Sequence, residues 1–319
     1  MNDTQRPDIY AEITNKFIDA LEKGTRPWQK PWTSIGGPRN AVTDRPYSGI
    51  NKLVCMLEAS SQDGDPRFCT FKQAKDAGWS VKKGAKAIHL VKWVELEKKP
   101  KFENKEKEEG EVIGTELSTE RKVLIPVGFS VFHASQINGI PPLEKKQVED
   151  HSEDIKKTQA LADTLSVRLV HTGDSAFYTR DLDRVVMPPP EAFHSSMDYA
   201  GTLLHELAHS TGHEKRLNRT FGKAFGDPEY AKEELRAELG SVFMATTRDL
   251  PLSEEHFEKH SAYLASWISA LKNDKKELFR AASDAEKIDS YVTKLELSER
   301  QETSLIQTDI QTEKRALRV

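Results

Sequence analysis

Apolar residues at the start of the chain recur at helical spacing. Within residues 8–23 they stand four positions apart, the period of an amphipathic helix, and Gly24 is placed to end that helix. Residues 25–51 are rich in proline, glycine and turn formers, so no long regular element is expected there. The pattern beyond predicts short helices and then strands, and so a mixed α+β domain, with helices at 48–60 and 71–78 and strands at 86–96 and 123–137.

Two charged segments divide the rest of the chain. The stretch at about 97–122 has low complexity and favours a solvated hairpin extension or a disordered loop, and 144–150 has the composition of a linker. We therefore expect a first domain at 1–145, a second at 151–297, and a polar tail at 298–319 that frays. The second domain is predicted to contain, in order, a helix at 154–166, a strand at 167–172, a hairpin at 176–189, and helices at 195–212, 228–247, 253–272 and 275–297.

Composition bounds the class of protein. Of 319 residues, 37% are hydrophobic and 31% are charged, which suits a globular protein with a well-hydrated surface. No run approaches the ~20 apolar residues of a membrane span, so no membrane partner is expected. The first residues lack the pattern of a secretion signal, and Cys55 and Cys69 are the only cysteines. A cytoplasmic location without disulfides is the expectation.

Cations and aromatic rings gather in the first domain. Residues 1–100 carry 17 Lys+Arg against 12 Asp+Glu, a balance of +5, which leaves −9 for the remainder. Aromatic rings stack on unpaired bases while cations contact phosphates, so the mixture suits single-stranded DNA better than duplex. Core packing of the tryptophans is the alternative. The candidate DNA-binding residues are Arg26, Trp28, Lys30, Trp32, Arg39, Arg45, Tyr47, Asn51, Trp79, Lys82, Lys83 and Lys86.

The letters HELAH at 205–209 form a metal-binding pattern on a predicted helix. Residues four apart share a helix face, so His205 and His209 can bind one ion while Glu206 lies beside the open coordination position. Zinc lowers the pKa of its bound water toward ~7, and a nearby carboxylate takes the proton. We expect zinc, or another divalent transition metal such as manganese, with Glu206 as the general base. Apolar flanks favour this hypothesis over a chance pair of histidines.

A third protein ligand is needed, because hydrolytic zinc usually has three. The predicted helix 228–247 offers Glu234 as that ligand and Glu238, one turn later, as a carboxylate that orients a ligand imidazole from behind. Glu229 and Glu233 are the alternatives for the third ligand. The alternative for each of these glutamates is that it lies on a solvent-exposed helix face and binds no metal.

This order of elements resembles the gluzincin branch of zincin metallopeptidases, whose third ligand is a glutamate after the second histidine. The spacing of Glu234-Leu-Arg-Ala-Glu238 matches that branch. The metzincin alternative needs a histidine where Lys215 stands, and His213 is expected to line the cleft or to cap the helix. The resemblance implies that the hairpin before HELAH binds an extended peptide by strand addition. Two tyrosines are candidate transition-state donors, with a core or rim position as the alternative for each: Tyr178 and Tyr199.

The first domain is similar to a second known family. PWQKPW, NAVTDRPYSGIN, the segment with Trp79 and Lys82-Lys83-Gly84, and FSVFHASQINGIP follow one another as in the N-terminal domain of the ArdC antirestriction family, which also occurs fused to plasmid primases. With HELAHSTGH, the resemblance covers roughly residues 8–297. It implies a single-stranded-DNA-binding domain before a zincin domain, an origin on conjugative plasmids, and protection of incoming DNA from host restriction. A restriction-system component is then the expected protein substrate.

Two other functions fit the residues. A plain metallopeptidase would use its basic domain to dock an acidic protein, and a DNA-binding protein would carry a structural or vestigial zinc site. DNA binding should weaken steeply with salt and prefer single strands, which separates it from protein docking. Glu206 argues against a structural site, which has no use for a general base.

Overall fold

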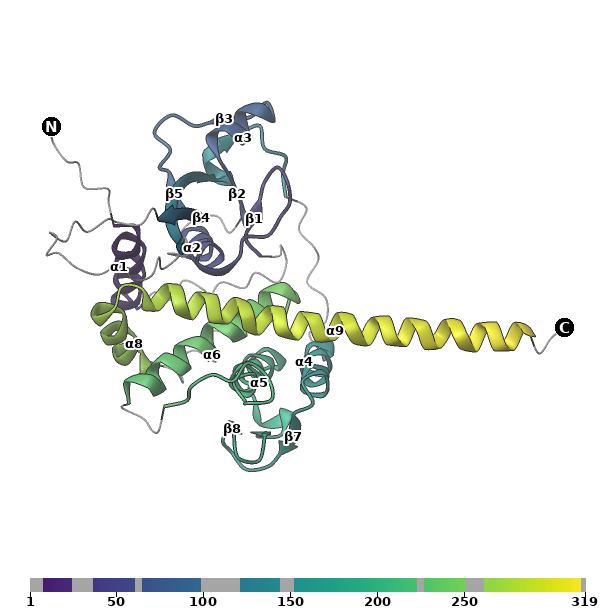
Figure 1. Ribbon diagram of the computed structural model, residues 1–319. Helices are drawn as coiled ribbons and strands as arrows, with labels where there is room; N and C mark the ends of the chain where they lie inside the picture. The colour runs from purple at the N-terminus through teal and green to yellow at the C-terminus, as the bar shows by residue number, and fades with distance from the viewer. Residues whose placement is uncertain are drawn as a thin grey trace, which may run out of the picture.

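The computed structural model describes residues 8–24, 37–60, 65–98, 121–143, 152–222, 227–250 and 261–316. The protein is mixed α+β, as predicted (Figure 1). Its first half contains α1 (Ile9–Glu22), β1 (Arg39–Asn40), α2 (Gly49–Ser60), β2 (Arg67–Cys69), α3 (Phe71–Asp76), β3 (Ser80–Val81), β4 (Ile88–Lys98), β5 (Arg121–His133) and β6 (Ile137–Asn138). Its second half contains α4 (Ser152–Thr164), β7 (Arg168–His171), β8 (Phe177–Thr179), β9 (Arg184–Met187), α5 (Ser196–Ser210), α6 (Pro228–Thr247), α8 (Ser261–Asn273) and α9 (Glu277–Ala316).

The long hairpin of β4 and β5 organises the first half. The two strands pair antiparallel from Ile88 opposite Val131 to Lys98 opposite Arg121, within a sheet of order β1-β2-β5-β4. The predicted charged loop between them, at 99–120, and the predicted linker at 144–150 lie outside the described residues. The strand predicted to reach 137 ends early. His133 and Gln136 cap a turn of 3-10 helix through their side chains, and this turns the chain out of the sheet.

Helix α1 begins and ends where its sequence indicates. The side chain of Asp8 accepts hydrogen bonds from the backbone N–H groups of Tyr10 and Ala11, which lack partners within the helix. Gly24 follows the helix with φ of +69°, a conformation that costs glycine little. The apolar face between these ends is buried and includes Ile13 and Phe17.

The second half places two helices and a small sheet around one cavity. The sheet has order β7-β9-β8, so β8 is an edge strand. A free edge is what strand addition of a peptide to the predicted hairpin would need. Helix α5 starts at the cap residue Ser195, and α6 starts at Asp227 with Pro228 in its first turn. Helix α6 packs against both α5 and α9. Among the described residues, no helix has the length and apolar character of a bilayer-crossing segment.

We predicted that the chain frays beyond residue 298, but the structure describes residues 298–316 as part of a helix. Helix α9 continues from Glu277 to Ala316 and extends away from the body of the protein (Figure 1). No glycine or proline occurs between 298 and 316, and the good helix formers glutamate, glutamine and arginine recur there. Because each added residue forms one further backbone hydrogen bond, a helix without a breaker propagates.

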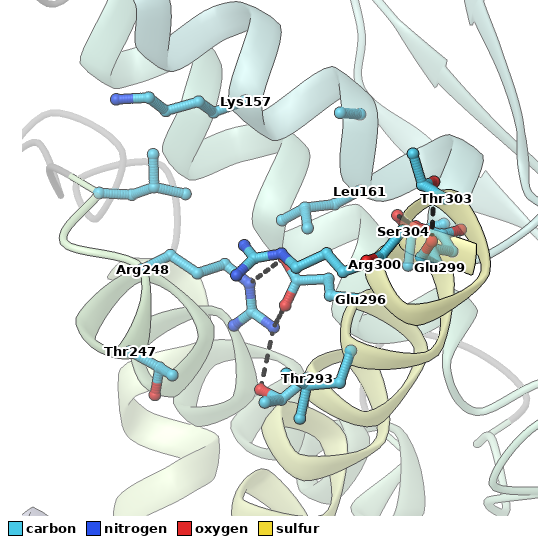
Figure 2. A pocket seen from close by; sticks show the side chains of 14 residues that line it. Lys157, Leu161, Thr247, Arg248, Thr293, Glu296, Glu299, Arg300, Thr303 and Ser304 are labelled. Carbon is cyan, nitrogen blue, oxygen red and sulfur yellow. Dashed lines mark hydrogen bonds and ion pairs between the residues drawn. The ribbon is translucent and has the colours of Figure 1, made fainter. Parts of the chain in front are cut away.

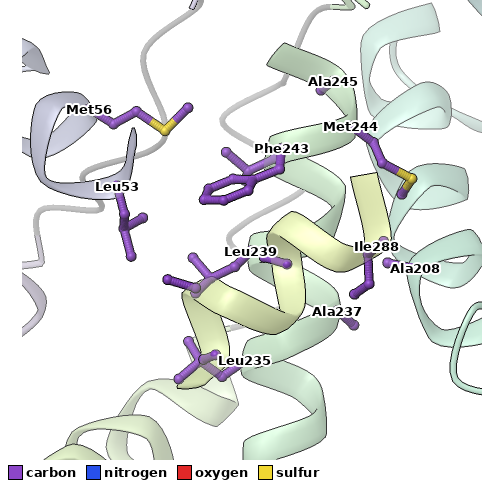
Figure 3. Packing of buried hydrophobic residues seen from close by; sticks show 14 of the residues in the cluster. Leu53, Met56, Ala208, Leu235, Ala237, Leu239, Phe243, Met244, Ala245 and Ile288 are labelled. Carbon is purple, nitrogen blue, oxygen red and sulfur yellow. The ribbon is translucent and has the colours of Figure 1, made fainter. Parts of the chain in front are cut away.

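One hydrophobic core joins the two halves. Leu53 and Met56 of α2 lie beside Leu239 and Phe243 of α6, with α9 next to them (Figure 3). Polar contacts reinforce this junction. Lys52 of α2 is buried, with its Nζ 3.6 Å from the Asp289 carboxylate and 4.4 Å from the centre of the Phe243 ring. The backbone N–H of Gly49 donates to Glu286 at 2.9 Å, and Thr14 donates to the carbonyl of Lys275 at 2.8 Å.

Candidate metal centre

The structure brings His205, His209 and Glu234 together between α5 and α6. The Nε2 atoms of His205 and His209 are 3.1 Å apart, and each lies 3.5 Å from a carboxylate oxygen of Glu234. These ligand atoms all lie within 4.8 Å of one another. A tetrahedral ion with bonds of about 2.0–2.1 Å holds its ligand atoms about 3.3–3.4 Å apart. The donor set and its spacing therefore fit one divalent ion.

Each imidazole has a second carboxylate behind it. Nδ1 of His205 lies 3.5 Å from Glu238, which is fully buried, and Nδ1 of His209 lies 3.3 Å from Glu233. Carboxylates in this position fix the orientation and tautomer of a metal-binding histidine. Glu238 thus lies behind His205. Glu233, one of the alternatives for third ligand, faces the back of His209 rather than the space between the two Nε2 atoms.

Arg219 holds Glu233 in place. Its Nε and Nη2 donate to the two oxygens of Glu233 at 3.0 and 2.7 Å, while Nη2 also donates to the carbonyl of Ala208 and Nη1 to the hydroxyl of Thr211. The same guanidinium therefore binds the end of α5 and a carboxylate of α6. Glu229, the other alternative ligand, is instead exposed and pairs with a lysine one turn along α6.

The field of these carboxylates favours positive charge between the imidazoles. Burial alone lowers the pKa of His205, but hydrogen bonds with Glu234 and Glu238 reverse this and raise it to about 10. Burial also lowers the pKa of His209, but its hydrogen bonds with Glu233 and Glu234 outweigh this and raise the pKa to about 9. Burial raises the pKa of Glu234, yet its contacts with both histidines outweigh this and hold it well below the ordinary value. The site is electrostatically suited to a cation.

Glu206 lies in the wall of a cavity of about 480 Å³ that also reaches the ligand atoms. Burial raises the pKa of its carboxyl, and the backbone N–H of Tyr178 in β8 donates to it. A buried carboxylate beside an ion can accept a proton from a water molecule there. The cavity is also lined by apolar and aromatic residues, namely Ala176, Phe177, Pro188, Phe193 and Phe221.

The tyrosines singled out from the sequence are occupied elsewhere. The hydroxyl of Tyr199, a fully buried residue, contacts Nε2 of His171 at 2.8 Å, and Tyr178 donates to Asp183 at 2.9 Å. Their core and rim interpretations therefore fit better than a donor role. Tyr178 does line the metal cavity, as do Tyr230 and Tyr263, whose hydroxyls are 3.3 Å apart.

His213 does not line this cavity among the described residues. Its Nδ1 accepts a hydrogen bond from the backbone N–H of Lys215 at 3.2 Å and lies 3.9 Å from Asp183. Asp183 is also bound by Arg216, which donates to the carbonyl of Ser210 at the end of α5. His213 thus serves the turn that follows α5, in agreement with a capping role.

Several candidate DNA-binding residues have structural contacts. Asn51 bonds both backbone groups of Val91, at 2.7 and 2.8 Å, and Arg39 pairs with Asp44 at 3.1 Å. Tyr47 is half-buried and lies 3.4 Å from the carbonyl of Phe68. Four of the candidates lie outside the described residues: Arg26, Trp28, Lys30 and Trp32.

The other candidates lie at or near the surface. Trp79 is half-buried and packs beside Gly139 and the buried Ile137, which agrees with the core interpretation of that indole. The remaining candidates are exposed cations, namely Arg45, Lys82, Lys83 and Lys86.

A second cavity, of about 850 Å³, lies between α4, α9 and the end of α6 (Figure 2). Arg248, which lines this cavity, donates to Glu296 at 2.7 Å and to Thr293 at 3.2 Å. The positive charge of Arg248 is therefore already paired with a carboxylate. No histidine or cysteine occurs among the described residues that line it. Its size alone does not make it a site for hydrolysis.

Comparisons with known proteins agree with this geometry. Residues 7–132 match the family described as the N-terminal domain of anti-restriction factor ArdC, and residues 156–284 match the family described as zincin-like metallopeptidase. The chain is 35% and 36% identical, over 95% and 91% of its length, to two DNA primases TraC of Escherichia coli. It spans only 28% and 20% of those two relatives.

A solved structure covers nearly the whole chain. The Mn(II)-bound crystal structure of antirestriction ArdC protein from plasmid R388 superimposes with a TM-score of 0.70 at 30% sequence identity, covering 90% of this chain and 98% of that one. A divalent metal is thus present in a protein of the same fold. On these matches, this chain belongs to the ArdC family of antirestriction proteins and carries a zincin-like metallopeptidase domain.

Proposed function

We propose that this protein is a zinc-dependent peptidase that also binds single-stranded DNA, and that it protects incoming plasmid DNA from host restriction during conjugation. One observation carries the peptidase part: His205, His209 and Glu234 converge with Glu206 in a cavity below an edge strand. A structural metal site has no need of that carboxylate or of an open cavity.

The residues of the cavity have distinct roles in this proposal. His205, His209 and Glu234 hold the ion, which when bound polarises a peptide carbonyl and lowers the pKa of water. An extended peptide pairs with the edge strand β8, as zincin substrates do by strand addition. Glu206 then accepts a proton from water and returns it to the leaving amine.

Two further hydroxyls support the same chemistry. Tyr230 precedes Glu234 by one turn of α6, and its hydroxyl lies 3.3 Å from that of Tyr263. Both side chains line the cavity with Glu206. We expect at least one of them to donate to the carbonyl oxygen as negative charge develops on it, an interaction that acts mainly in the transition state.

The DNA and restriction parts of the proposal rest on family membership and charge. The R388 protein is named as an antirestriction protein and the TraC relatives as DNA primases. The first 100 residues of this chain carry a balance of +5 in a protein of net charge −4. We infer a cytoplasmic protein whose peptide substrate is a component of the restriction system.

Elemental analysis and peptide hydrolysis test the peptidase part. The full-length protein should hold about one zinc per chain, and Glu206→Ala should keep the metal but abolish hydrolysis of an unfolded protein substrate. His205→Ala with His209→Ala should lose the metal while the fold persists. Wild-type protein that hydrolyses nothing with zinc bound would favour a vestigial site.

Transfer of a plasmid into a restricting recipient tests the biological role. Wild-type protein should raise the survival of incoming DNA above that of a plasmid without the gene. Glu206→Ala in the same full-length chain is the matched variant, because it changes the general base and leaves the DNA-binding half intact. Equal survival with wild type and Glu206→Ala would show that protection does not need hydrolysis.

A further inference from the structure

We infer that single-stranded DNA binds to a small basic lobe formed by residues 71–86, with Phe71 stacking on a base. The lobe consists of α3, β3 and the turn that leads into β4. This inference rests on the DNA-binding role proposed above. It adds the surface and the aromatic side chain that contact the strand.

The lobe concentrates positive charge. Its 16 residues include five lysines and one acidic residue, Asp76, a balance of +4 on a chain whose net charge is −4. All five lysines are exposed, and no carboxylate of the described residues pairs with them. Unpaired surface cations release counterions when they contact phosphates, which favours a polyanion as partner. These lysines are Lys72, Lys75, Lys82, Lys83 and Lys86.

Phe71 is the aromatic ring that the lobe presents to solvent. Its exposed fraction is 59%, whereas Trp79, the indole in the same lobe, packs against the small core around Ile137. Phe71 occupies the first position of α3. A capping box between Thr70 and Gln73 fixes that helix start, so the backbone that carries the ring is well ordered.

The rest of the lobe is tied to the segment 134–138, which holds a 3-10 turn and strand β6. The backbone N–H of Lys82 donates to the carbonyl of Gln136 at 2.9 Å, and its Nζ donates to the carbonyl of Ser135 at 2.6 Å. Strand β3 pairs with β6. Lys82 therefore has a structural bond of its own, while Lys72, Lys75 and Lys83 can contact phosphates without losing one.

A single strand fits this surface better than a duplex or an acidic protein. The flat face of an exposed phenyl ring gains most from a base that is free to stack, and a duplex hides its base faces. An acidic protein would contact the lysines but offers no row of unpaired bases, on which a flat exposed ring stacks. In Figure 1, α3 and β3 lie at the opposite end of the molecule from β7 and β8, so bound DNA leaves the metal cavity open.

Charge reversal in the full-length protein tests the lysines. The variant carrying Lys72→Glu, Lys75→Glu and Lys83→Glu should bind fluorescent oligothymidylate more than tenfold more weakly. Its plot of log affinity against log salt should be shallower by about two units, since each phosphate contact contributes about 0.7. The matched control carries the same charge change at exposed lysines of other surfaces, and its slope should be unchanged: Lys156→Glu, Lys215→Glu and Lys294→Glu.

Substitution of the ring tests the stacking. Phe71→Ala should weaken oligothymidylate binding about tenfold at an unchanged melting temperature, because the ring is mostly exposed, and Phe71→Trp should retain the affinity. Wild-type affinity and slope in the triple-lysine variant would overturn the inference while leaving DNA binding itself intact. Equal binding of duplex and single strand would overturn the stacking. Absence of binding by the wild-type protein at low salt would instead refute the proposed DNA-binding function.

Discussion

Replacement of Glu233 by glutamine tests whether Glu233 binds the metal itself or only orients the metal ligand His209. Glu233→Gln keeps the shape of the side chain and an acceptor for Arg219, but removes the negative charge 3.3 Å from Nδ1 of His209. If Glu233 only orients His209, the variant should still bind metal, more weakly. If Glu233 is a ligand, the variant should lose the metal as Glu234→Gln does.

The structure sets the expected magnitude. Loss of a carboxylate behind a ligand histidine typically costs 10- to 100-fold in metal affinity. Arg219 already neutralises part of the charge of Glu233 through two hydrogen bonds, so we expect the lower end, about tenfold or ~1.4 kcal/mol. Glu238 is fully buried, where charges interact more strongly, so Glu238→Gln should lie nearer to a hundredfold. Glu234→Gln should exceed both.

The assay is a competition titration of zinc between the full-length protein and a chromophoric chelator. The melting temperature of each metal-free variant serves as the control for folding, since a misfolded protein also loses metal. We expect zinc affinity to decrease from Glu233→Gln to Glu238→Gln and to be lowest in Glu234→Gln. An affinity unchanged by Glu233→Gln would refute the positioning role, and complete loss in a folded protein would place Glu233 among the ligands.

Three further changes have outcomes that follow from named contacts. Because the pKa values of His205 and His209 are raised in the metal-free protein, both imidazoles favour their protonated forms at pH 7. Zinc binding should therefore release about two protons, measured by calorimetry in buffers of different ionisation enthalpy, and zinc affinity should fall as the pH is lowered. Asp289→Ala leaves a buried lysine and arginine without their shared carboxylate and should cost about 3–5 kcal/mol in the free energy of unfolding by urea. Gly240→Ala would place a methyl group 2.8 Å from Cδ1 of Ile288, so it should destabilise by about 1–3 kcal/mol, and Ile288→Val in the same chain should recover part of that loss.

The elements that the sequence reveals are those with enough residues to show a period. Helices α1, α5 and α6 repeat their apolar positions over three turns or more and begin at residues that cap helices. Strands of two or three residues, such as β1 and β3, are too short for alternation to appear. They exist because a partner strand pairs with them, and that partner is remote in the sequence.

The candidate site divides in the same way. His205, Glu206 and His209 lie within one helix, so their spacing alone places them on neighbouring faces. Arg219 comes from a loop between helices and Tyr263 from α8, and only tertiary packing brings them to the site. The one-turn spacing to Glu238 favoured Glu234 over the adjacent Glu233, but which of the two faces α5 depends on how the two helices cross.

The two halves of the chain differ in proposed function, yet they share a core that bears on the metal site. Helix α6 carries Glu234 and Glu238 toward α5, while its Leu239 and Phe243 belong to one buried cluster with Leu53 and Met56 of α2 (Figure 3), and the centre of the Phe243 ring lies 4.4 Å from Nζ of Lys52. Removal of the first half would expose those apolar side chains to water, at about 25 cal/mol for each Å² uncovered. We therefore expect residues 151–297 alone to be less stable and to hold zinc less tightly than the full chain. The boundary near residue 145 separates two proposed functions more cleanly than it separates two independently stable folding units.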